Sequence, residues 1–412
     1  MKKALFAVVC CLIVATSTFA AVPKGYGLKR VSPESVGMSS KRLEKLDSIF
    51  NGAVAQKDFP GAVVCVVKDD KIVYEKAFGV KQWLPKEEGP MTVETVFDMA
   101  SLSKCVGTTL SFMQLIENGQ VRLTDYVKDY IPDFAPWVDP ETGRKVDITI
   151  QHLLTHSSGL EAYINVARYE KEHPNSTPDS LINYIATKVG RTFRPGTNFR
   201  YSCLNFVTLQ NVLQNVTGEK LCDYAQKNVF DKLGLKNTHY YPIGYKFDKE
   251  TLANIAPTEV QADGKPYRGQ VHDPIANKLN WGNSGNAGVF SNAEDLAIIA
   301  AALMNGGEWN GRRVMSAKMV ERMFSVPTEY PAFIGRGLGW DFWSSYASPR
   351  GDLFSRTRSA NHTGYTGTSM VMDLDEKVAL IVLTNRVHPS DGGNVSRSRA
   401  VAANVVASAI LK

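Results

Sequence analysis

The amino-acid sequence predicts an α+β fold, in which an antiparallel sheet is flanked by helices and a mainly helical lobe is inserted in the middle. Three observations predict it. Strand-like apolar segments lie near both ends of the chain, helical patterns accompany them, and the long stretch between them is mostly helical or loop-like in pattern. A sheet assembled from both ends of the chain is the simplest architecture that accommodates this order.

The first elements follow in order from residue 41. Residues 41–54 carry apolar side chains at the spacing typical of a helix. Residues 61–68 and 72–74 are strand-like and are separated by Asp69 and Asp70, so they predict a β-hairpin.

The C-terminal part supplies the rest of the predicted sheet. Residues 367–374 and 378–384 predict two strands joined by a turn, and residues 394–411 predict a final helix. In the middle, Ser291 and Glu294 form a capping-box pattern, which predicts that a helix begins there.

The N-terminus is typical of a signal peptide. Lys2 and Lys3 precede an apolar run over residues 4–15, and Thr18-Phe19-Ala20 follows before Ala21. The run is shorter than the roughly 20 residues that a membrane-spanning helix needs, so a retained anchor is the less favoured alternative. We expect residues 1–20 to be removed by cleavage near Ala20, giving a periplasmic or secreted protein without a transmembrane segment.

Composition and charge exclude several classes of function. The chain has 412 residues, of which 44% are hydrophobic and 21% charged, as in ordinary soluble globular proteins. Its net charge of +6 is mild and is not gathered into Lys/Arg runs, so nucleic-acid binding is not expected. No G-x-G-x-x-G or P-loop pattern is present, and no cofactor is expected.

The cysteines predict neither a disulfide framework nor a zinc site. Cys10 and Cys11 lie in the signal segment, and the other four have apolar or helical surroundings without C-x-x-C spacing. These four are Cys65, Cys105, Cys203 and Cys222. Pairing is an open alternative in an exported protein, but buried free thiols are the favoured state.

Ser101 and Lys104 form the one S-x-x-K pattern in the chain. Residues three apart share a helix face, so the Lys104 amine would lie beside the Ser101 hydroxyl. A serine hydroxyl becomes a good nucleophile only when a base removes its proton. We expect burial or neighbouring cations to lower the pKa of Lys104 from its usual value of about 10.4, which would make it that base. The alternative is a chance pattern of two common residues.

Two further motifs strengthen the case. Tyr201 would share proton transfer with the lysine if that cation stabilises its phenolate, although an isolated tyrosine is more often a packing residue. The segment 362–365 (His-Thr-Gly-Tyr) precedes a predicted strand, and its glycine would let a ligand approach the backbone closely. The N–H groups of Ser101 and Tyr365 would then form an oxyanion hole; the alternative is an ordinary turn.

The three motifs, in this order and at these separations, resemble the serine β-lactamase and penicillin-binding protein superfamily, in its class C-like branch. Residues 148–160, 233–238 and 288–296 agree with the same resemblance, which extends over nearly all of the mature sequence. It implies a β-lactamase/transpeptidase-like fold with the active serine between a sheet and a helical lobe. It also implies acyl-enzyme chemistry without a metal.

The resemblance also implies the division of the chain and the residue roles. Residues 21–412 would form one catalytic unit, with a sheet lobe at about 27–98 plus 285–412 and a helical lobe at about 99–284. Ser101 would be the nucleophile, Lys104 its base and Tyr201 an acid or base. His362, Thr363 and Gly364 stand where the family has Lys-Thr-Gly or a variant with histidine.

Two departures from the family pattern bear on the substrate. Cys203 stands where the commonest motif has an Asn that contacts a substrate amide, and a thiol cannot make that contact. His362 is mostly uncharged at neutral pH if its pKa is near 6.5, so it would hold a carboxylate less firmly than lysine does. Both departures argue against efficient β-lactam hydrolysis and favour an esterase, a D-amino-acid peptidase or a cell-wall amidase.

Residues 271–274 and 285–290 are similar to a subset of the family that includes exo-acting amidases, which remove peptide from N-acetylmuramic acid. His272 and Asp273 are therefore candidates for lining the cleft, with a structural turn as an equal alternative. Arg386, which follows a predicted strand, would meet an anionic substrate group unless it is an ordinary surface arginine.

His152 and His156 have the i, i+4 spacing of zinc ligands, but Leu153 stands where an H-E-x-x-H motif has its glutamate. We interpret both as structural and expect no metal. The function predicted overall is an exported serine hydrolase acting on a cell-wall peptide, as a D-amino-acid carboxypeptidase or muramoyl-peptide amidase, or on a small ester. The alternative is a catalytically weak penicillin-recognising protein that binds or senses its ligand.

Overall fold

The computed structural model describes residues 26–411. The predicted signal peptide and its cleavage site lie outside this part of the chain. Among residues 26–411, none of the helices combines the length and apolar character that crossing a membrane requires.

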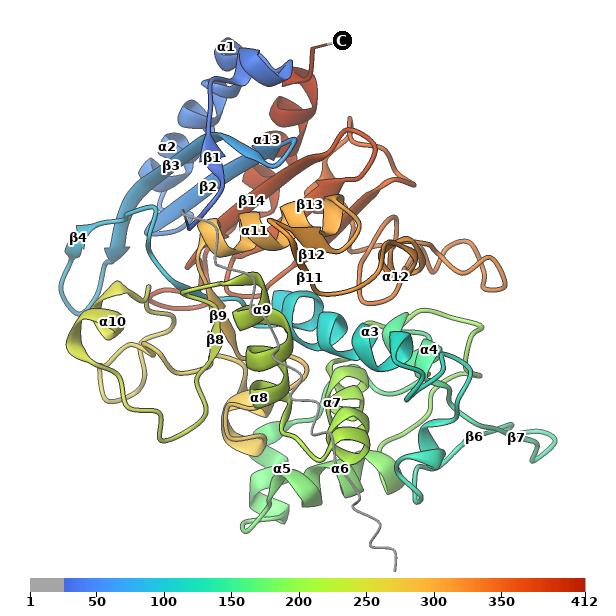
Figure 1. Ribbon diagram of the computed structural model, residues 1–412. Coiled ribbons are helices and arrows are strands. Elements are labelled where there is room, and N and C mark those ends of the chain that lie inside the picture. The colour runs from blue at the N-terminus through green and yellow to red at the C-terminus, as the bar shows by residue number, and fades with distance from the viewer. Residues whose placement is uncertain (1–25, 412) are drawn as a thin grey trace, which may run out of the picture.

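The main sheet contains seven strands from the two ends of the described chain (Figure 1). Its order is β1-β3-β2-β14-β13-β12, with β4 paired to β3. The strands are β1 (Lys29–Arg30), β2 (Gly61–Lys68), β3 (Lys71–Gln82), β4 (Glu88–Pro90), β12 (Ser359–Thr363), β13 (Ser369–Asp373) and β14 (Val378–Thr384). All neighbours are antiparallel except β1, which runs parallel to β3. The predicted antiparallel sheet is thus confirmed apart from one short edge strand.

The sheet is covered by helices on both faces, which explains why β2 is apolar along almost its whole length. Val63 and Cys65 belong to the core shared with α11 (Ala293–Met304), whereas Val64 and Val66 belong to the core shared with the helices on the other face. Those helices are α1 (Ser40–Leu43), α2 (Lys45–Ala55) and α13 (Ser396–Ala409) (Figure 1). Because successive side chains of a strand point to opposite faces, burial of both faces requires a continuous apolar run.

Helices supply most of the regular secondary structure between β4 and β12, as predicted. Its other helices are α3 (Leu110–Glu117), α4 (Ile150–Leu154), α5 (Val166–Glu172), α6 (Pro178–Thr187), α7 (Cys203–Thr217), α8 (Leu221–Ala225), α9 (Asp231–Leu233), α10 (Lys249–Asn254) and α12 (Ala317–Met323). Its short strands are β5 (Phe97–Asp98), β6 (Trp137–Val138), β7 (Lys145–Val146), β8 (His239–Tyr240), β9 (Val289–Ser291), β10 (Glu308–Trp309) and β11 (Arg312–Arg313). The residue limits of the two lobes stay a prediction.

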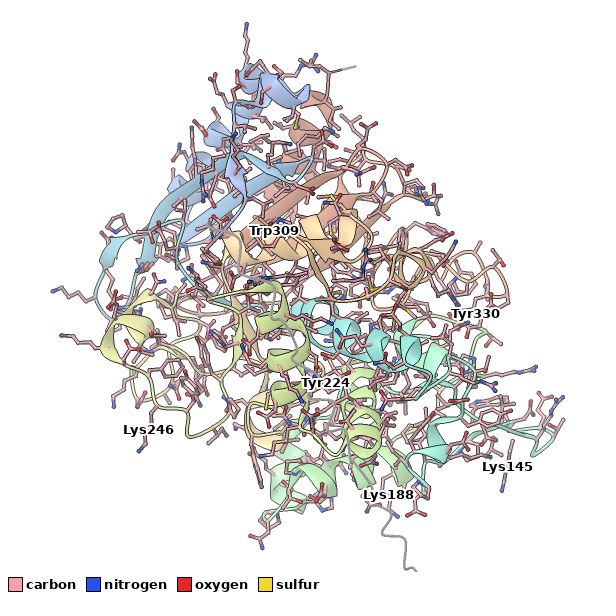
Figure 2. The ribbon with its side chains drawn as sticks, viewed as in Figure 1. Lys145, Lys188, Tyr224, Lys246, Trp309 and Tyr330 are labelled. Carbon is pink, nitrogen blue, oxygen red and sulfur yellow. The ribbon has the colours of Figure 1, made fainter. Side chains whose placement is uncertain are left out.

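Two details differ from the sequence prediction or complete it. The helix predicted to begin at Ser291 begins one residue later. Ser291 is the last residue of β9 and pairs with Phe97 of β5, so Asn292 takes the capping position of α11 and accepts a hydrogen bond from the Asp295 N–H. Cys65, Cys105, Cys203 and Cys222 are free and buried, as predicted. Figure 2 shows Lys145, Lys188 and Lys246 projecting from separate parts of the molecule, so these exposed cations do not share one patch.

Candidate active site

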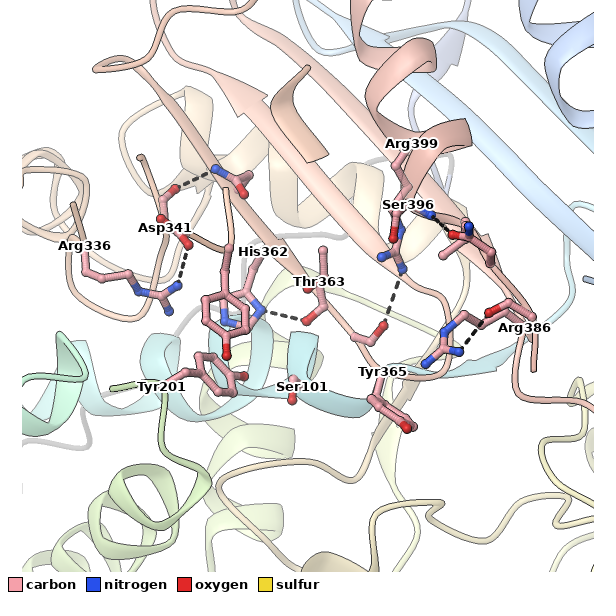
Figure 3. Close-up of a pocket in the computed structure, with 16 residues that line it drawn as sticks. Ser101, Tyr201, Arg336, Asp341, His362, Thr363, Tyr365, Arg386, Ser396 and Arg399 are labelled. Carbon is pink, nitrogen blue, oxygen red and sulfur yellow. Dashed lines mark hydrogen bonds and ion pairs between the residues drawn. The ribbon is translucent and has the colours of Figure 1, made fainter. Parts of the chain in front are cut away.

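A cavity of about 420 Å³ opens beside Ser101 (Figure 3). Of the residues predicted for the site, its wall includes Ser101, Tyr201, His362, Thr363, Gly364, Tyr365 and Arg386. It also includes residues that the sequence did not single out, among them Arg336, Asp341, Tyr346, Asn361 and Arg399. Figure 3 shows Ser101 next to the strand that carries His362 and Thr363, with Arg336 and Arg386 on opposite sides of it.

Ser101 lies on a short 3₁₀ turn, Ala100–Leu102, which Met99 links to β5. Ala100, before it, has a positive φ of 44°, a conformation that strains a residue with a side chain by an amount of order 1–3 kcal/mol. Asp98 holds this turn, because its Oδ1 accepts a hydrogen bond of 2.8 Å from the Ala100 N–H. Burial raises the pKa of Asp98, and the backbone N–H groups of His272 and Ala100 partly oppose that shift. The serine is therefore presented on a strained turn that a buried carboxyl group braces.

Lys104 is fully buried and its amine meets the Ser101 hydroxyl. Its Nζ donates to Ser101 Oγ at 2.9 Å and to the Asn286 carbonyl at 2.7 Å, and it contacts Cys203 Sγ at 3.5 Å. Lys104 begins a π-helix, Lys104–Thr109, and not the regular helix that the i, i+3 argument assumed. The structure nevertheless places the two side chains together.

The pKa of Lys104 does not shift as expected from the sequence. Burial is the largest influence and lowers it, but ionised Cys203 and Tyr201 raise it and the net shift of the pKa is upward. The expected downward shift is therefore wrong. The upward influence exists only while one of these neighbours is ionised, and burial raises the pKa of both Tyr201 and Cys203. Lys104, Tyr201 and Cys203 therefore titrate as a group. The state in which all three are neutral holds the same number of protons as the state in which Lys104 is an ammonium and one of its neighbours is an anion.

Tyr201 is placed between the lysine and the cavity. Its ring centroid lies 5.1 Å from Lys104 Nζ, 5.2 Å from the stacked ring of Tyr346 and 4.4 Å from that of His156. Its hydroxyl oxygen is buried and makes no well-formed hydrogen bond within residues 26–411. A phenol held rigidly by its ring, with its hydroxyl beside Lys104 and Ser101, is suited to moving a proton.

His362 is buried and uncharged. Burial, and then the charges of Arg336 and Lys104, hold its pKa well below the usual value. Its Nδ1 donates to the Thr363 carbonyl at 2.8 Å. This state agrees with the expectation that His362 would not attract a carboxylate as a lysine would.

Gly364 allows β12 to approach the serine turn. A Cβ at this position would lie 2.2 Å from the Met99 carbonyl oxygen and 2.2 Å from Thr368 Oγ1. No side chain fits at those distances, so only glycine lets the backbone of this segment lie against the residues that lead into Ser101.

Arg386 and Tyr365 occupy the end of the cavity opposite Arg336. The Tyr365 hydroxyl donates to Asp391, and Arg386 pairs with the same carboxylate at 2.8 Å. The Arg386 guanidinium also lies 4.7 Å from the centroid of the Tyr365 ring. Arg386 lines the cavity, but its charge is balanced by Asp391.

His272 and Asp273 are not among the described residues that line this cavity. The His272 N–H donates to Asp98 Oδ2 at 2.7 Å, and Asp273 Oδ1 accepts from Asn286 Nδ2 at 3.0 Å and from the Ala276 N–H at 2.9 Å. They brace Asp98, which holds the turn before Ser101, and Asn286, whose carbonyl accepts from Lys104, which agrees better with the structural alternative.

The paired histidines have structural contacts. His152 Nδ1 accepts from the Thr149 N–H at 3.0 Å at the start of α4, and His156 Nδ1 accepts from the Ser202 N–H at 3.1 Å. Within residues 26–411, no group of three or more His, Cys, Asp and Glu side chains is arranged to hold a metal ion. These hydrogen bonds agree with the structural interpretation of both histidines.

Two of the arginines that line the cavity, Arg336 and Arg399, were not singled out by any sequence motif. Arg336 is buried and pairs with Asp341 at 2.9 Å, and the two residues belong to a loop without a motif. Arg399, on α13, is buried; its Nη2 donates to the Thr368 carbonyl at 2.6 Å, and burial lowers its pKa to about 9. Only the folding of these segments against β12 brings the arginines to the serine.

Comparison with known proteins places the chain in a family. The sequence pattern described as beta-lactamase matches residues 46–404. The chain belongs to the beta-lactamase family. The protein is a serine hydrolase of this family.

Two relatives span almost the full length. A protein of Escherichia coli K12, provisionally named a D-alanyl-D-alanine carboxypeptidase, is 28% identical over 403 residues, which cover 91% of this chain and 89% of the relative. The N-acetylmuramyl-L-alanine amidase of Bacillus subtilis 168 is 29% identical over 392 residues, which cover 89% of this chain and 87% of the amidase.

Solved structures agree with the fold of this beta-lactamase-family chain. EstCE1, a hydrolase with promiscuous acyltransferase activity, superposes with a TM-score of 0.70 at 23% identity, covering 89% of this chain and 99% of EstCE1. The octameric penicillin-binding protein homologue of Pyrococcus abyssi superposes with a TM-score of 0.64 at 23% identity, covering 88% of this chain and 76% of the homologue. The predicted β-lactamase/transpeptidase-like fold is confirmed.

Proposed function

We propose that this protein is an exported hydrolase that cleaves an amide or ester bond of a cell-wall peptide through an acyl-enzyme on Ser101. The observation that carries the proposal is the hydrogen bond of 2.9 Å between Lys104 Nζ and Ser101 Oγ, at the wall of a cavity. The names of the two relatives support a cell-wall peptide as the substrate.

Acylation begins when the Ser101 hydroxyl loses its proton. The proton passes to Lys104 when its amine is neutral, or to the Tyr201 phenolate when Lys104 is the ammonium. The Ser101 oxygen then attacks the substrate carbonyl, and the negative charge that develops on the carbonyl oxygen is stabilised by the N–H groups of Ser101 and Tyr365.

The intermediate collapses when the leaving atom receives a proton. Tyr201 is the donor, and Lys104 restores the phenol, so the proton taken from Ser101 leaves with the first product. Water then attacks the ester on Ser101, gives one proton to the same pair of groups, and the second product departs as its acid while Ser101 regains its hydroxyl.

Covalent labelling tests the nucleophile. Intact-mass measurement with a fluorophosphonate should show one adduct on the wild-type protein and none on Ser101→Ala. Ser103→Ala is a matched control, because the Ser103 hydroxyl is also buried nearby but accepts from the Val289 N–H at 3.0 Å, away from the cavity. This variant should label normally.

Product analysis then tests the substrate. Purified cell-wall muropeptides should lose either a terminal D-alanine, as a carboxypeptidase requires, or the whole peptide from muramic acid, as an amidase requires. If neither adduct nor turnover of muropeptides or simple esters is found, the hydrolase proposal is refuted and a penicillin-recognising binding protein takes its place.

A further inference from the structure

Tyr346 packs against the ring of Tyr201, although no sequence motif marks it. The two ring centroids are 5.2 Å apart and the ring planes differ by 24°, as in a stacked pair. Tyr346 also meets Phe199 nearly edge-on, at 6.0 Å and 70°. It lines the cavity beside Ser101 and is 53% exposed, so it holds Tyr201 from the solvent side. Tyr346 belongs to residues 336–346, which we call the clamp loop.

The place of the Tyr201 ring decides where its hydroxyl lies, which is beside the proposed base and nucleophile. The hydroxyl is the outermost atom of a long side chain, so a small rotation of the side-chain torsions displaces it. A displacement of 1 Å in a catalytic site can cost about 10²-fold in rate. Two further rings lie close, those of His156 at 4.4 Å and His362 at 6.0 Å, and both residues are buried. Tyr346 is the exposed neighbour, so its position depends on its own loop.

The carboxylate of Asp341 is the centre of the clamp loop. It accepts from Arg336 Nη1 at 2.9 Å, from the Ser344 N–H at 3.0 Å and from the Ser344 hydroxyl at 2.5 Å. The Ser344 oxygen in turn accepts from the Tyr346 N–H at 3.2 Å. The Asp341 backbone exchanges two hydrogen bonds with Asn361 of β12, at 2.9 Å and 2.8 Å. A continuous series of hydrogen bonds therefore joins β12 to the backbone of Tyr346.

The buried ion pair between Arg336 and Asp341 gains a role from this arrangement (Figure 3). A buried ion pair contributes little net stability, but it can fix one arrangement of the segments that it joins. The Arg336 guanidinium also lies 5.8 Å from the centroid of the Tyr201 ring. The pair thus ties the clamp loop to the same ring that Tyr346 covers.

We infer that Tyr346 is a positioning residue for proton transfer: held by the clamp loop, it keeps the Tyr201 ring where the phenol can protonate the leaving atom. The inference rests on the proposed function and deepens it, because it concerns the step in which the leaving group receives its proton. Tyr346 acts through Tyr201, and its ring carries the role while its hydroxyl does not.

Two acetate esters that differ in whether the leaving group needs a proton test the inference. p-Nitrophenolate leaves p-nitrophenyl acetate without a proton, whereas trifluoroethoxide is strongly basic and leaves trifluoroethyl acetate as the alcohol. For each variant, kcat/KM for the trifluoroethyl ester is divided by kcat/KM for the nitrophenyl ester, both measured by acid release. This ratio does not depend on the concentration of folded enzyme, so partial unfolding leaves it unchanged.

Tyr346→Ala should lower the ratio about tenfold, a part of the roughly 10²–10⁴-fold that a general acid contributes. Tyr346→Phe should keep the wild-type ratio, because the stacked ring remains. In a Tyr201→Phe background, Tyr346→Ala should leave the ratio unchanged, since the group through which it acts is gone. Ser344→Ala should lower the ratio about threefold, because the Tyr346 N–H loses its acceptor while both rings stay. This variant decides the test if Tyr346→Ala does not fold.

Tyr245→Ala is the matched control. Tyr245 is 52% exposed and its ring lies 4.8 Å from that of Tyr241, but it lines a different cavity, so the ratio should not change. The inference is overturned by an unchanged ratio in Tyr346→Ala, by an equal fall in Tyr346→Phe or Tyr245→Ala, or by a further fall in the Tyr201→Phe background. Absence of ester turnover and of the fluorophosphonate adduct from the wild-type protein would instead refute the proposed function, and the inference with it.

Discussion

Replacing Gly364 by alanine tests whether the approach of β12 to the serine turn is needed for activity. The added Cβ would lie 2.2 Å from the Met99 carbonyl oxygen, and Thr368 Oγ1, which is equally close, already donates to that oxygen at 2.9 Å. Neither neighbour is the end of a long flexible side chain, so the two backbone segments must separate by roughly 1 Å to reach van der Waals contact. Met99 leads to Ser101 and Gly364 leads to Tyr365, so the separation moves apart the two N–H groups proposed to stabilise the oxyanion.

The expected loss is large for one methyl group. Losing one oxyanion donor typically lowers the rate by about 10²–10³-fold, and a displacement of 1 Å in a catalytic site can cost about 10²-fold, so we expect kcat/KM to fall by about 10²-fold. Overpacking should also lower the free energy of unfolding by about 1–3 kcal/mol. Hydrolysis of p-nitrophenyl acetate, normalised to the folded fraction by thermal unfolding, measures the first effect. Gly392→Ala is the control, because a Cβ there meets nothing within 4 Å. A folded Gly364→Ala variant with wild-type kcat/KM would refute the proposed oxyanion hole.

Three further predictions concern single residues. Lys104→Ala should lower ester turnover by about 10²–10⁴-fold, as expected for loss of a general base, with an unchanged circular dichroism spectrum; near-normal turnover would contradict the base assignment. Cys203→Asn should create measurable β-lactam hydrolysis, assayed with a chromogenic cephalosporin, and an unchanged profile would show that Cys203 does not restrict the substrate. Burial lowers the pKa of His152 to about 4, so the unfolded chain takes up a proton before the folded one as the pH falls. The free energy of unfolding should therefore decrease by about 2 kcal/mol between pH 7 and pH 5 from this residue alone, and urea unfolding of His152→Asn should show a smaller decrease.

The strands predicted most accurately are those that can be recognised from their apolar composition alone. The range predicted as 378–384 is the range of β14, because every residue in it is apolar or small and both faces of that strand are covered. β12 went unpredicted, since Ser359–Thr363 contains mostly polar residues whose partners come from other segments, such as Asp373 for the Ser359 hydroxyl. Strand character there comes from tertiary hydrogen bonds that no local pattern records.

The candidate site divides in the same way. Ser101, Lys104 and Tyr201 belong to short motifs, so their meeting could be predicted from spacing and resemblance. Asp98 and Arg336 lie in no motif, and their roles depend on which backbone groups the fold brings to them. The direction of the Lys104 pKa shift was wrong for a related reason: burial was predicted, but the two ionisable neighbours that outweigh it were not.

The neutral state of His362 bears on Lys104 as well as on the substrate. A lysine at position 362 would place a second cation near Lys104 and lower its pKa. A carboxylate bound there would raise that pKa further and so reduce the fraction of neutral amine that can accept the serine proton. The pKa of Lys104 is already raised in the absence of any ligand. An uncharged group bound there would leave the sharing of protons between Lys104 and Tyr201 as it is, so the proton balance of the catalytic groups favours an uncharged group over a carboxylate at this position.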